Sequence, residues 1–363
     1  MGLIALALAL LIEQLRPLRP DNRPHRFARE LVDLARQHSR TDRPFDAVIA
    51  WFAVVAGSIV LVLLLQWIAA AIGSLASFLL HVAILYLTVG FGQFGHNLAA
   101  ILVALRRDET ARAARLLDDW IAAGERRVAM SSTVDDATAE PPGRVWLCRR
   151  AITHALTSAY RELFAPILAY LLLPGAVGPV VYRVVDLLAR RWSEPAPSEF
   201  DTVIDDFGAQ EGASADDEAT ASRWSPGIAA DAGDDAHAGV AARGMYIVDW
   251  IPLRVTAAGF AIAGDFEDST YCWRAAIAAG AGRDRRAMLA AIGGGALGLD
   301  LVDPERDRYW AGNRVEGVPG SFDWMGAPPD AAGIRGTIAL IWRAATLVIG
   351  LFVLVSLSSW LGG

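Results

Sequence analysis

Cysteine is scarce in this chain of 363 residues, which contains only Cys148 and Cys272. The two are far apart and neither has a CxxC partner, which excludes a zinc ribbon and a disulfide framework, so both are interpreted as small apolar residues. Charged residues make up only 20% of the chain, whereas soluble proteins have roughly a quarter. Hydrophobic residues make up 54% and are concentrated in blocks, which indicates a membrane protein.

Common ligand motifs are also missing. The glycines at 293–295 do not form a phosphate loop, because no Lys-Ser/Thr pair follows them, and close packing of helices explains them instead. The most acidic stretch, residues 194–237, does not have the carboxylate spacing of an EF-hand. No positively charged residues precede the apolar residues 2–15, as a secretory signal requires, so we expect an uncleaved first helix that is fully or partly inserted.

The apolar blocks predict an all-α, polytopic membrane bundle with about five spans, counted from stretches near the ~20 residues that cross a bilayer. The second and third blocks are joined by a short break, as in a helical hairpin. The fourth contains Pro166, Pro174 and Pro179, so we expect it to be kinked and either buried or re-entrant. The blocks are residues 2–15, 47–72, 75–105, 163–188, 245–263 and 337–360.

Arginines dominate the loops between these blocks. Residues 16–43 contain eight arginines against four acidic residues, and residues 106–150 are also rich in arginine. The positive-inside rule then places both loops in the cytoplasm of a bacterium, with the chain as a multi-pass protein of the inner membrane. The second loop has Leu116, Leu117, Trp120 and Ile121 at helical spacing, which predicts a cytoplasmic amphipathic helix.

Residues 194–237 contain twelve acidic residues and one basic residue among Ala, Gly, Ser and Pro. Such a segment buries too little apolar surface to offset its chain entropy, so we expect a disordered, solvated linker. The predicted organisation is therefore N-terminal membrane helices with basic loops at 1–192, an acidic linker at 193–243, and C-terminal helices of the same bundle at 244–363.

Several segments carry a family resemblance. The sharpest is YIVDWIPLRVTAAGFAIAGDFEDSTYCWRAA at 246–276, in which Pro252 and Arg254 occupy a Pro-x-Arg pattern and Asp249 is the nearest acidic residue before it. This segment is similar to one in the CobD/CbiB family of cobalamin-biosynthesis membrane proteins and in their relative AmpE, and it resembles AmpE more closely. Supporting segments, in the same order, are ALTSAYRELFAPIL at 155–168, VVYRVVDLL at 180–188, MLAAIGGGALGLDL at 288–301 and GTIALIWRAATLVIGLF at 336–352.

The resemblance implies a chemistry and a set of candidate residues. Enzymes of the family ligate a corrinoid carboxylate to aminopropanol phosphate with ATP, which requires carboxylates for magnesium and cations for phosphate. Where those enzymes have a Glu-Asn-Asp series, this chain has His154, Arg161 and Glu162 before Ala165 and Pro166. The resemblance therefore implies catalytic candidates and ligand-binding candidates but no metal ligand: the first are His154, Glu162 and Asp186, the second Tyr182, Arg183, Asp249 and Arg254.

Each candidate also has a simpler interpretation. Asp249 and Arg254 either hold a cation and an anion, or serve as a helix N-cap and an anchor to lipid headgroups. Arg183 and Asp186 either bind a ligand or form an ion pair worth ~0.2–0.5 kcal/mol. His154 is either an acid–base group or a solvated histidine on a helix face.

Arg343 lies inside the last apolar block, where an arginine costs at least ~2.5 kcal/mol, so we expect it to have an acidic partner or to face a cavity. Two functions remain open. In one, the protein has an altered ligase site and a binding, sensing or regulatory role, with a corrinoid or another small molecule as its ligand. In the other, it is an active synthase that uses ATP and magnesium. The lipid bilayer is the expected partner, and nucleic acid is not. A transporter is less favoured because hydropathy shows no inverted repeat.

Overall fold

The computed structural model describes residues 2–15, 30, 32, 44–90, 94–124, 143–173, 175–193, 232–278, 280–301 and 326–361. Within these ranges the chain is helical, apart from turns and one isolated bridge between Leu299 and Ala327, so the all-α prediction is confirmed there. Three features predicted above lie wholly or mainly outside the described residues. They are the basic loop 16–43, Pro174 and the acidic residues 194–231.

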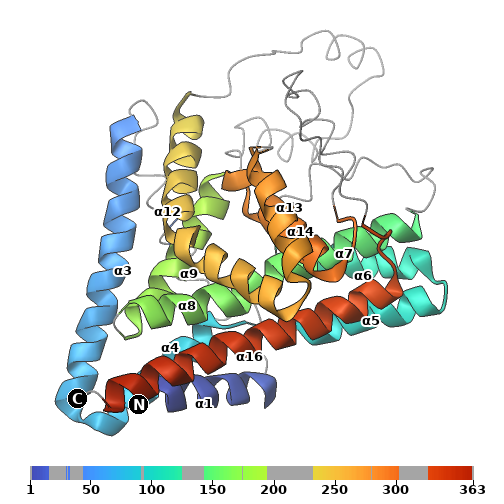
Figure 1. Cartoon of the computed structure of the whole chain (residues 1–363). Coiled ribbons are helices and arrows are strands. Elements are labelled where there is room, and N and C mark those ends of the chain that lie inside the picture. The colour runs from blue at the N-terminus through green and yellow to red at the C-terminus, as the bar shows by residue number, and fades with distance from the viewer. Residues whose placement is uncertain are drawn as a thin grey trace, which may run out of the picture. The chain divides into compact units, whose positions relative to one another are not determined.

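Fourteen helical elements make up the described chain (Figure 1). In chain order they are α1 (Gly2–Leu15), α3 (Pro44–Ile72), α4 (Ser74–Thr88), α5 (Phe94–Arg106), α6 (Thr110–Gly124), α7 (Arg144–Ala159), η2 (Tyr160–Phe164), α8 (Ala165–Leu172), α9 (Val177–Trp192), α12 (Ala232–Ala263), α13 (Phe266–Ala278), η3 (Ala281–Arg283), α14 (Arg285–Leu297) and α16 (Ala331–Leu361).

Three of these helices are long and apolar enough to cross a membrane. Their apolar parts are Phe45–Ile72 in α3, Ala236–Ala263 in α12 and Ala331–Ser358 in α16, each of 28 residues. At about 1.5 Å per residue each extends roughly 42 Å, which exceeds the ~30 Å hydrocarbon core. The additional spans counted from hydropathy stay a prediction.

Two apolar blocks are divided between shorter helices. Residues 75–105 are divided between α4 and α5. The helix α4 ends at Thr88, because the backbone of Val89 is extended. Residues 163–188 are shared by η2, α8 and α9, with Gly175 in a left-handed conformation at φ 68° between α8 and α9. Most side chains of α8 are buried, so the prediction of an interrupted and buried element is confirmed.

The chain divides into two compact units, and three helices have residues in both. The first unit contains Met1–Asn22, Leu61–Arg183 and Val248–Gly363, and the second contains Arg23–Val60 and Val184–Ile247. These units follow contacts between helices, and the predicted organisation into 1–192, 193–243 and 244–363 stays a prediction. In addition, α12 begins at Ala232, so residues 232–243, which the sequence assigns to the linker, are helical. The alanines of this segment favour a helix.

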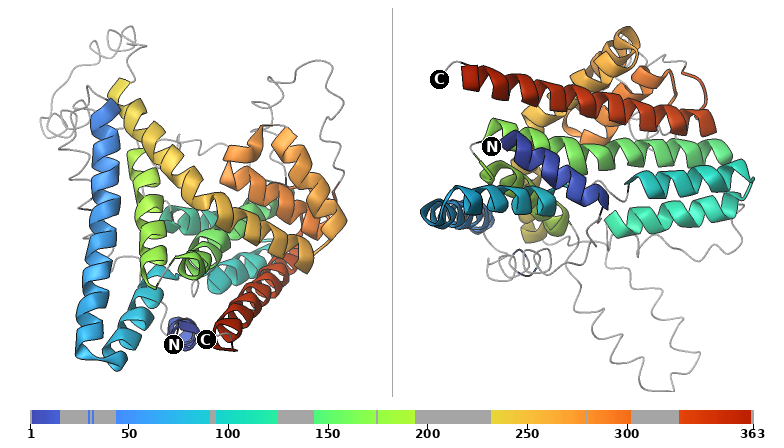
Figure 2. Two further views of the ribbon diagram at one scale, coloured as in Figure 1. Left: turned by 60° about the vertical axis from the view of Figure 1, so that its left-hand side comes forward. Right: turned by 90° about the horizontal axis from the view of Figure 1, so that it is seen from below.

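In the first unit α16, α7, α5 and α6 run side by side (Figure 2, right). The central helix is α7, which is buried at most positions and contacts α5, α6, α14 and α16. Glycines permit close approach around α14, as predicted. A Cβ on Gly293 would lie 2.4 Å from a methyl carbon of Leu156, and one on Gly295 would lie 2.6 Å from the carbonyl oxygen of Asp268. Packing therefore accounts for the triple-glycine run.

The second unit has a smaller core between parts of α3, α9 and α12. A Cβ on Gly244 would lie 2.4 Å from the indole ring of Trp51, so glycine is needed where α12 passes α3. The rings of Trp192 and His237 meet edge to face at 5.0 Å between centroids. Through these aromatic side chains, the first half of α12 packs on α9 and α3.

Candidate functional site

The site is built on a widened helical turn that a proline creates. Pro166 has no N–H, so the carbonyl of Glu162 has no partner four residues along the helix. That carbonyl instead accepts a hydrogen bond from the N–H of Gly90 at 3.2 Å. The N–H of Ala165 bonds to the carbonyl of Tyr160, which makes η2 a π-helical turn. Such turns are frequent at functional sites, and this one carries three polar side chains in succession.

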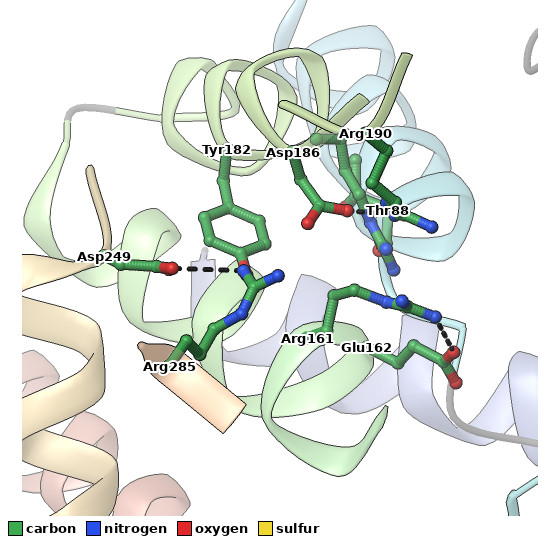
Figure 3. A network of polar contacts seen from close by, with 9 residues as sticks. Thr88, Arg161, Glu162, Tyr182, Asp186, Arg190, Asp249 and Arg285 are labelled. Atoms are coloured by element: carbon green, nitrogen blue, oxygen red, sulfur yellow. Dashed lines mark hydrogen bonds and ion pairs between the residues drawn. The ribbon is translucent and has the colours of Figure 1, made fainter. Parts of the chain in front are cut away.

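The centre of the site is the ion pair between Asp249 and Arg285, with Tyr182 beside it (Figure 3). Tyr160 Oη donates to Asp249 Oδ1 at 2.6 Å, and Arg285 Nη1 donates to Asp249 Oδ2 at 3.1 Å. The guanidinium of Arg285 also lies 5.9 Å from the ring centroid of Tyr160 and 3.5 Å from the hydroxyl of Tyr182. These residues come from η2, α9, α12 and α14, so the network joins four elements of the first unit.

Burial determines the protonation of this network. Tyr160 and Tyr182 are fully buried, and the side chain of Asp249 is nearly so. Burial, with the neighbouring Tyr182 and Asp249, raises the pKa of Tyr160 well above its ordinary value. Tyr160 therefore stays protonated and acts as a donor to the carboxylate. Asp249 lies inside α12 and so is not an N-cap, which excludes the simpler of its two predicted roles.

Arg254 does not join Asp249. Positions five apart on a helix point about 140° away from each other, so the two side chains leave α12 on different sides. The Arg254 guanidinium lies 4.1 Å from the ring centroid of Trp250, and its Nη1 donates to the carbonyl of Trp250 at 2.9 Å. Trp250 is itself exposed. This surface position favours the headgroup anchor over the anion site predicted with Asp249.

The remaining predicted residues lie in separate pairs. Arg161 Nη2 and Glu162 Oε1 are 3.2 Å apart within η2, and both side chains are largely buried (Figure 3). Arg183 belongs to the first unit, where its Nε donates to the carbonyl of Thr88 at 2.6 Å. That carbonyl ends α4, where a cation is favoured by the helix dipole.

Asp186 belongs to the second unit and is fully buried. It forms an ion pair with Arg190, one helical turn further along α9. Arg190 is therefore one ion-pair partner of this carboxylate, and the predicted pair with Arg183 stays a prediction. Like Glu162 and Asp249, Asp186 forms an ion pair with an arginine.

His154 is buried, so the interpretation as a solvated histidine is wrong. Its ring meets Trp120 edge to face at 4.6 Å, and its Nε2 lies 3.3 Å from Ser158 Oγ. Burial, together with Arg161 and two further arginines, lowers the pKa of His154 to about 3. The imidazole is therefore neutral at physiological pH and far from the pKa that suits a general acid or base there.

The described carboxylates of the site are not arranged as a magnesium site. In the part of the chain that the structure describes, no three His, Cys, Asp or Glu side chains converge as metal ligands. Asp249 and Glu162, two of the candidate carboxylates, are each paired with an arginine. The arrangement suits recognition by hydrogen bonds and charge better than metal-assisted transfer.

Arg285 is the main residue that sequence reasoning missed. It begins α14, directly after Asp284, whose Oδ1 accepts from the backbone N–H groups of Arg286 and Ala287 at 2.9 and 3.1 Å. This N-cap fixes the start of the helix and thereby the direction of Arg285. The signal available was an aspartate before two arginines and a run of small residues.

Comparison of the chain with protein-family models, with curated proteins and with solved structures finds no match.

Proposed function

We propose that this protein is a membrane-embedded binding protein of the CobD/CbiB–AmpE type, with an altered ligase site and a sensing or regulatory role. The observation that carries the proposal is the buried network of Tyr160, Asp249 and Arg285. In it the carboxylate that the resemblance would offer to a cation is neutralised by an arginine and a phenol. An active ligase needs such carboxylates for magnesium.

The ligand class follows from the resemblance and from the site's chemistry. A corrinoid or another small molecule with carboxylate or amide groups matches the donors of Arg285 and Tyr182. The location proposed is the bacterial inner membrane, with the arginine-rich loops in the cytoplasm. Three helices long and apolar enough to span a bilayer support the membrane part of this proposal.

The alternative is an active synthase that joins a corrinoid carboxylate to aminopropanol phosphate. It is supported by the order of the resembling segments and by the convergence of Tyr182 and Asp249 on one arginine. In this alternative Asp249 would have to release Arg285 when magnesium binds. The two functions therefore differ in whether ATP–magnesium binds at all.

The test uses the full-length protein purified in detergent, with equilibrium dialysis against cobinamide and against ATP–magnesium. A product assay supplies a corrinoid with a free carboxylate, aminopropanol phosphate and ATP–magnesium. We expect saturable cobinamide binding without ATP–magnesium and no amide product. Tyr182→Phe, which keeps the ion pair, should weaken cobinamide binding, whereas Glu267→Gln on the exposed side of α13 should not. Amide formation would establish the synthase, and no cobinamide binding would remove corrinoids as the ligand.

A further inference from the structure

Of the two settings expected for Arg343 on α16, an acidic partner is not found among the residues that the structure describes. The Arg343 side chain is exposed, and its Nε donates to the carbonyl of Ala339 in the same helix at 3.3 Å. The cation therefore faces the surroundings of the protein in the middle of an apolar helix.

The two halves of α16 differ on either side of Arg343. Before it, Ile334, Thr337, Leu340 and Ile341 are fully buried, and α16 packs on α7, α14 and α5 of the first unit. After it, residues 344–361 contain no charged residue, and one face of the helix stays buried as far as Phe352, which contacts the ring of Tyr170. Large apolar side chains in this second half are exposed on several faces, as lipid-facing residues are, namely Leu347, Leu351, Val353, Leu354, Val355 and Leu357.

Length places the membrane boundary at the same point. Residues 344–361 extend about 27 Å as a helix, close to the ~30 Å hydrocarbon core. The whole of α16 would extend about 46 Å, and in that case Arg343 would lie about 18 Å from its start, deep in the bilayer. A span that begins after Arg343 avoids burying the cation in hydrocarbon.

The residues at this boundary suit a phospholipid headgroup. Trp342 is 47% exposed, and tryptophans are enriched at the headgroup level of membranes. A guanidinium presents a planar set of donors that matches phosphate oxygens, and it keeps its charge at every physiological pH.

We propose that Trp342 and Arg343 form a binding site for the phosphate of an anionic phospholipid, at the level where the uncharged part of α16 enters the bilayer. The first twelve or so residues of α16 then lie outside the hydrocarbon, at about 1.5 Å per residue. The site is separate from the Asp249 network and does not depend on the small molecule that the network binds.

The binding test uses the full-length protein in nonionic detergent, with dioleoylphosphatidylglycerol and dioleoylphosphatidylcholine as probes and native mass spectrometry as the readout. Arg343→Gln should weaken phosphatidylglycerol binding about fivefold, the effect of one cation at an anionic membrane surface. Arg343→Lys should keep most of the binding, and Arg335→Gln, an exposed arginine two turns earlier, should keep all of it. Excess inorganic phosphate should not displace the lipid.

Wild-type binding by Arg343→Gln, or an equal loss in Arg335→Gln, would overturn the proposal. A second measurement tests the depth independently. With the buried native cysteines unchanged, a water-soluble maleimide added to both membrane faces should label Ala339→Cys and leave Leu354→Cys unlabelled. Equal protection of both positions would show that α16 enters the bilayer before Arg343, which also overturns the proposal.

Discussion

Replacing Asp249 by Asn removes the negative charge that Arg285 and Tyr160 share. The side chain of Asp249 is 8% exposed and that of Arg285 is 23% exposed, so the variant leaves a largely buried cation without its counter-ion. Loss of one member of a buried ion pair costs about 3–5 kcal/mol. The partial exposure of Arg285 places Asp249→Asn at the lower end, about 3 kcal/mol.

The reverse change, Arg285→Met, should lower the stability more, because it leaves the more deeply buried carboxylate without a counter-ion. In the double variant neither charge is left alone. Its loss of stability should therefore be smaller than the sum of the single losses by about 2 kcal/mol.

Thermal unfolding of the detergent-solubilised full-length chain, followed by tryptophan fluorescence, measures these differences. At about 2 °C per kcal/mol, Asp249→Asn should lower the Tm by about 6 °C. Glu267→Gln, a carboxylate exposed on α13, is the matched control and should leave the Tm unchanged. Equal Tm values for Asp249→Asn and the control, or strictly additive losses in the double variant, would refute the reasoning.

Three further predictions concern the rest of the first unit. At about pH 7.5 neither Cys148 nor Cys272 should react with maleimide until the protein is unfolded in SDS, because burial raises their pKa to about 11 and about 12. Because burial lowers the pKa of His154 from 6.5 to about 3, the unfolded chain binds the extra proton between these values. The contribution of the neutral His154 to stability should be complete above about pH 6.5, and it should fall by up to ~1.4 kcal/mol for each pH unit below that value. His154→Gln should flatten this part of a Tm–pH profile. Gly295→Ala, whose Cβ would lie 2.6 Å from a backbone carbonyl of α13, should lower stability by about 1–3 kcal/mol, whereas Gly350→Ala, with nothing within 4 Å, should leave the Tm unchanged.

Composition and periodicity were enough to predict the helical class and the three long apolar helices, because both follow from local preference and from the length of the apolar runs. The triple glycine at 293–295 was also interpretable, since small residues at close helix contacts leave a direct trace in the sequence. The break after Thr88 was harder to see. The residues on both sides of it are mainly apolar, and the polar residues near the break are too few to divide the block by hydropathy.

The partners within the site could not be predicted in the same way. Arg254 is five residues from Asp249 and seemed the natural partner, yet helix geometry sends the two side chains to different sides of α12. Arg285 is far along the chain, and only the packing of α12, α14 and η2 brings it to Asp249. Contacts of this kind depend on tertiary packing, which a single sequence does not encode in any local pattern.

Pro166 links the backbone geometry of η2 to a contact with a distant segment of the chain. Its missing N–H releases the carbonyl of Glu162, and the N–H of Gly90 takes up that carbonyl, which ties η2 to the segment after α4. The π-helical turn adds one residue to the helical repeat, so the faces of α7 and α8 are offset by about 100° from a continuous α-helix. A helical wheel extended from α7 therefore assigns the wrong face to the residues beyond Tyr160. Tyr160, which donates to Asp249, begins the turn and keeps the register of α7, whereas Arg161 and Glu162 lie within the wider turn.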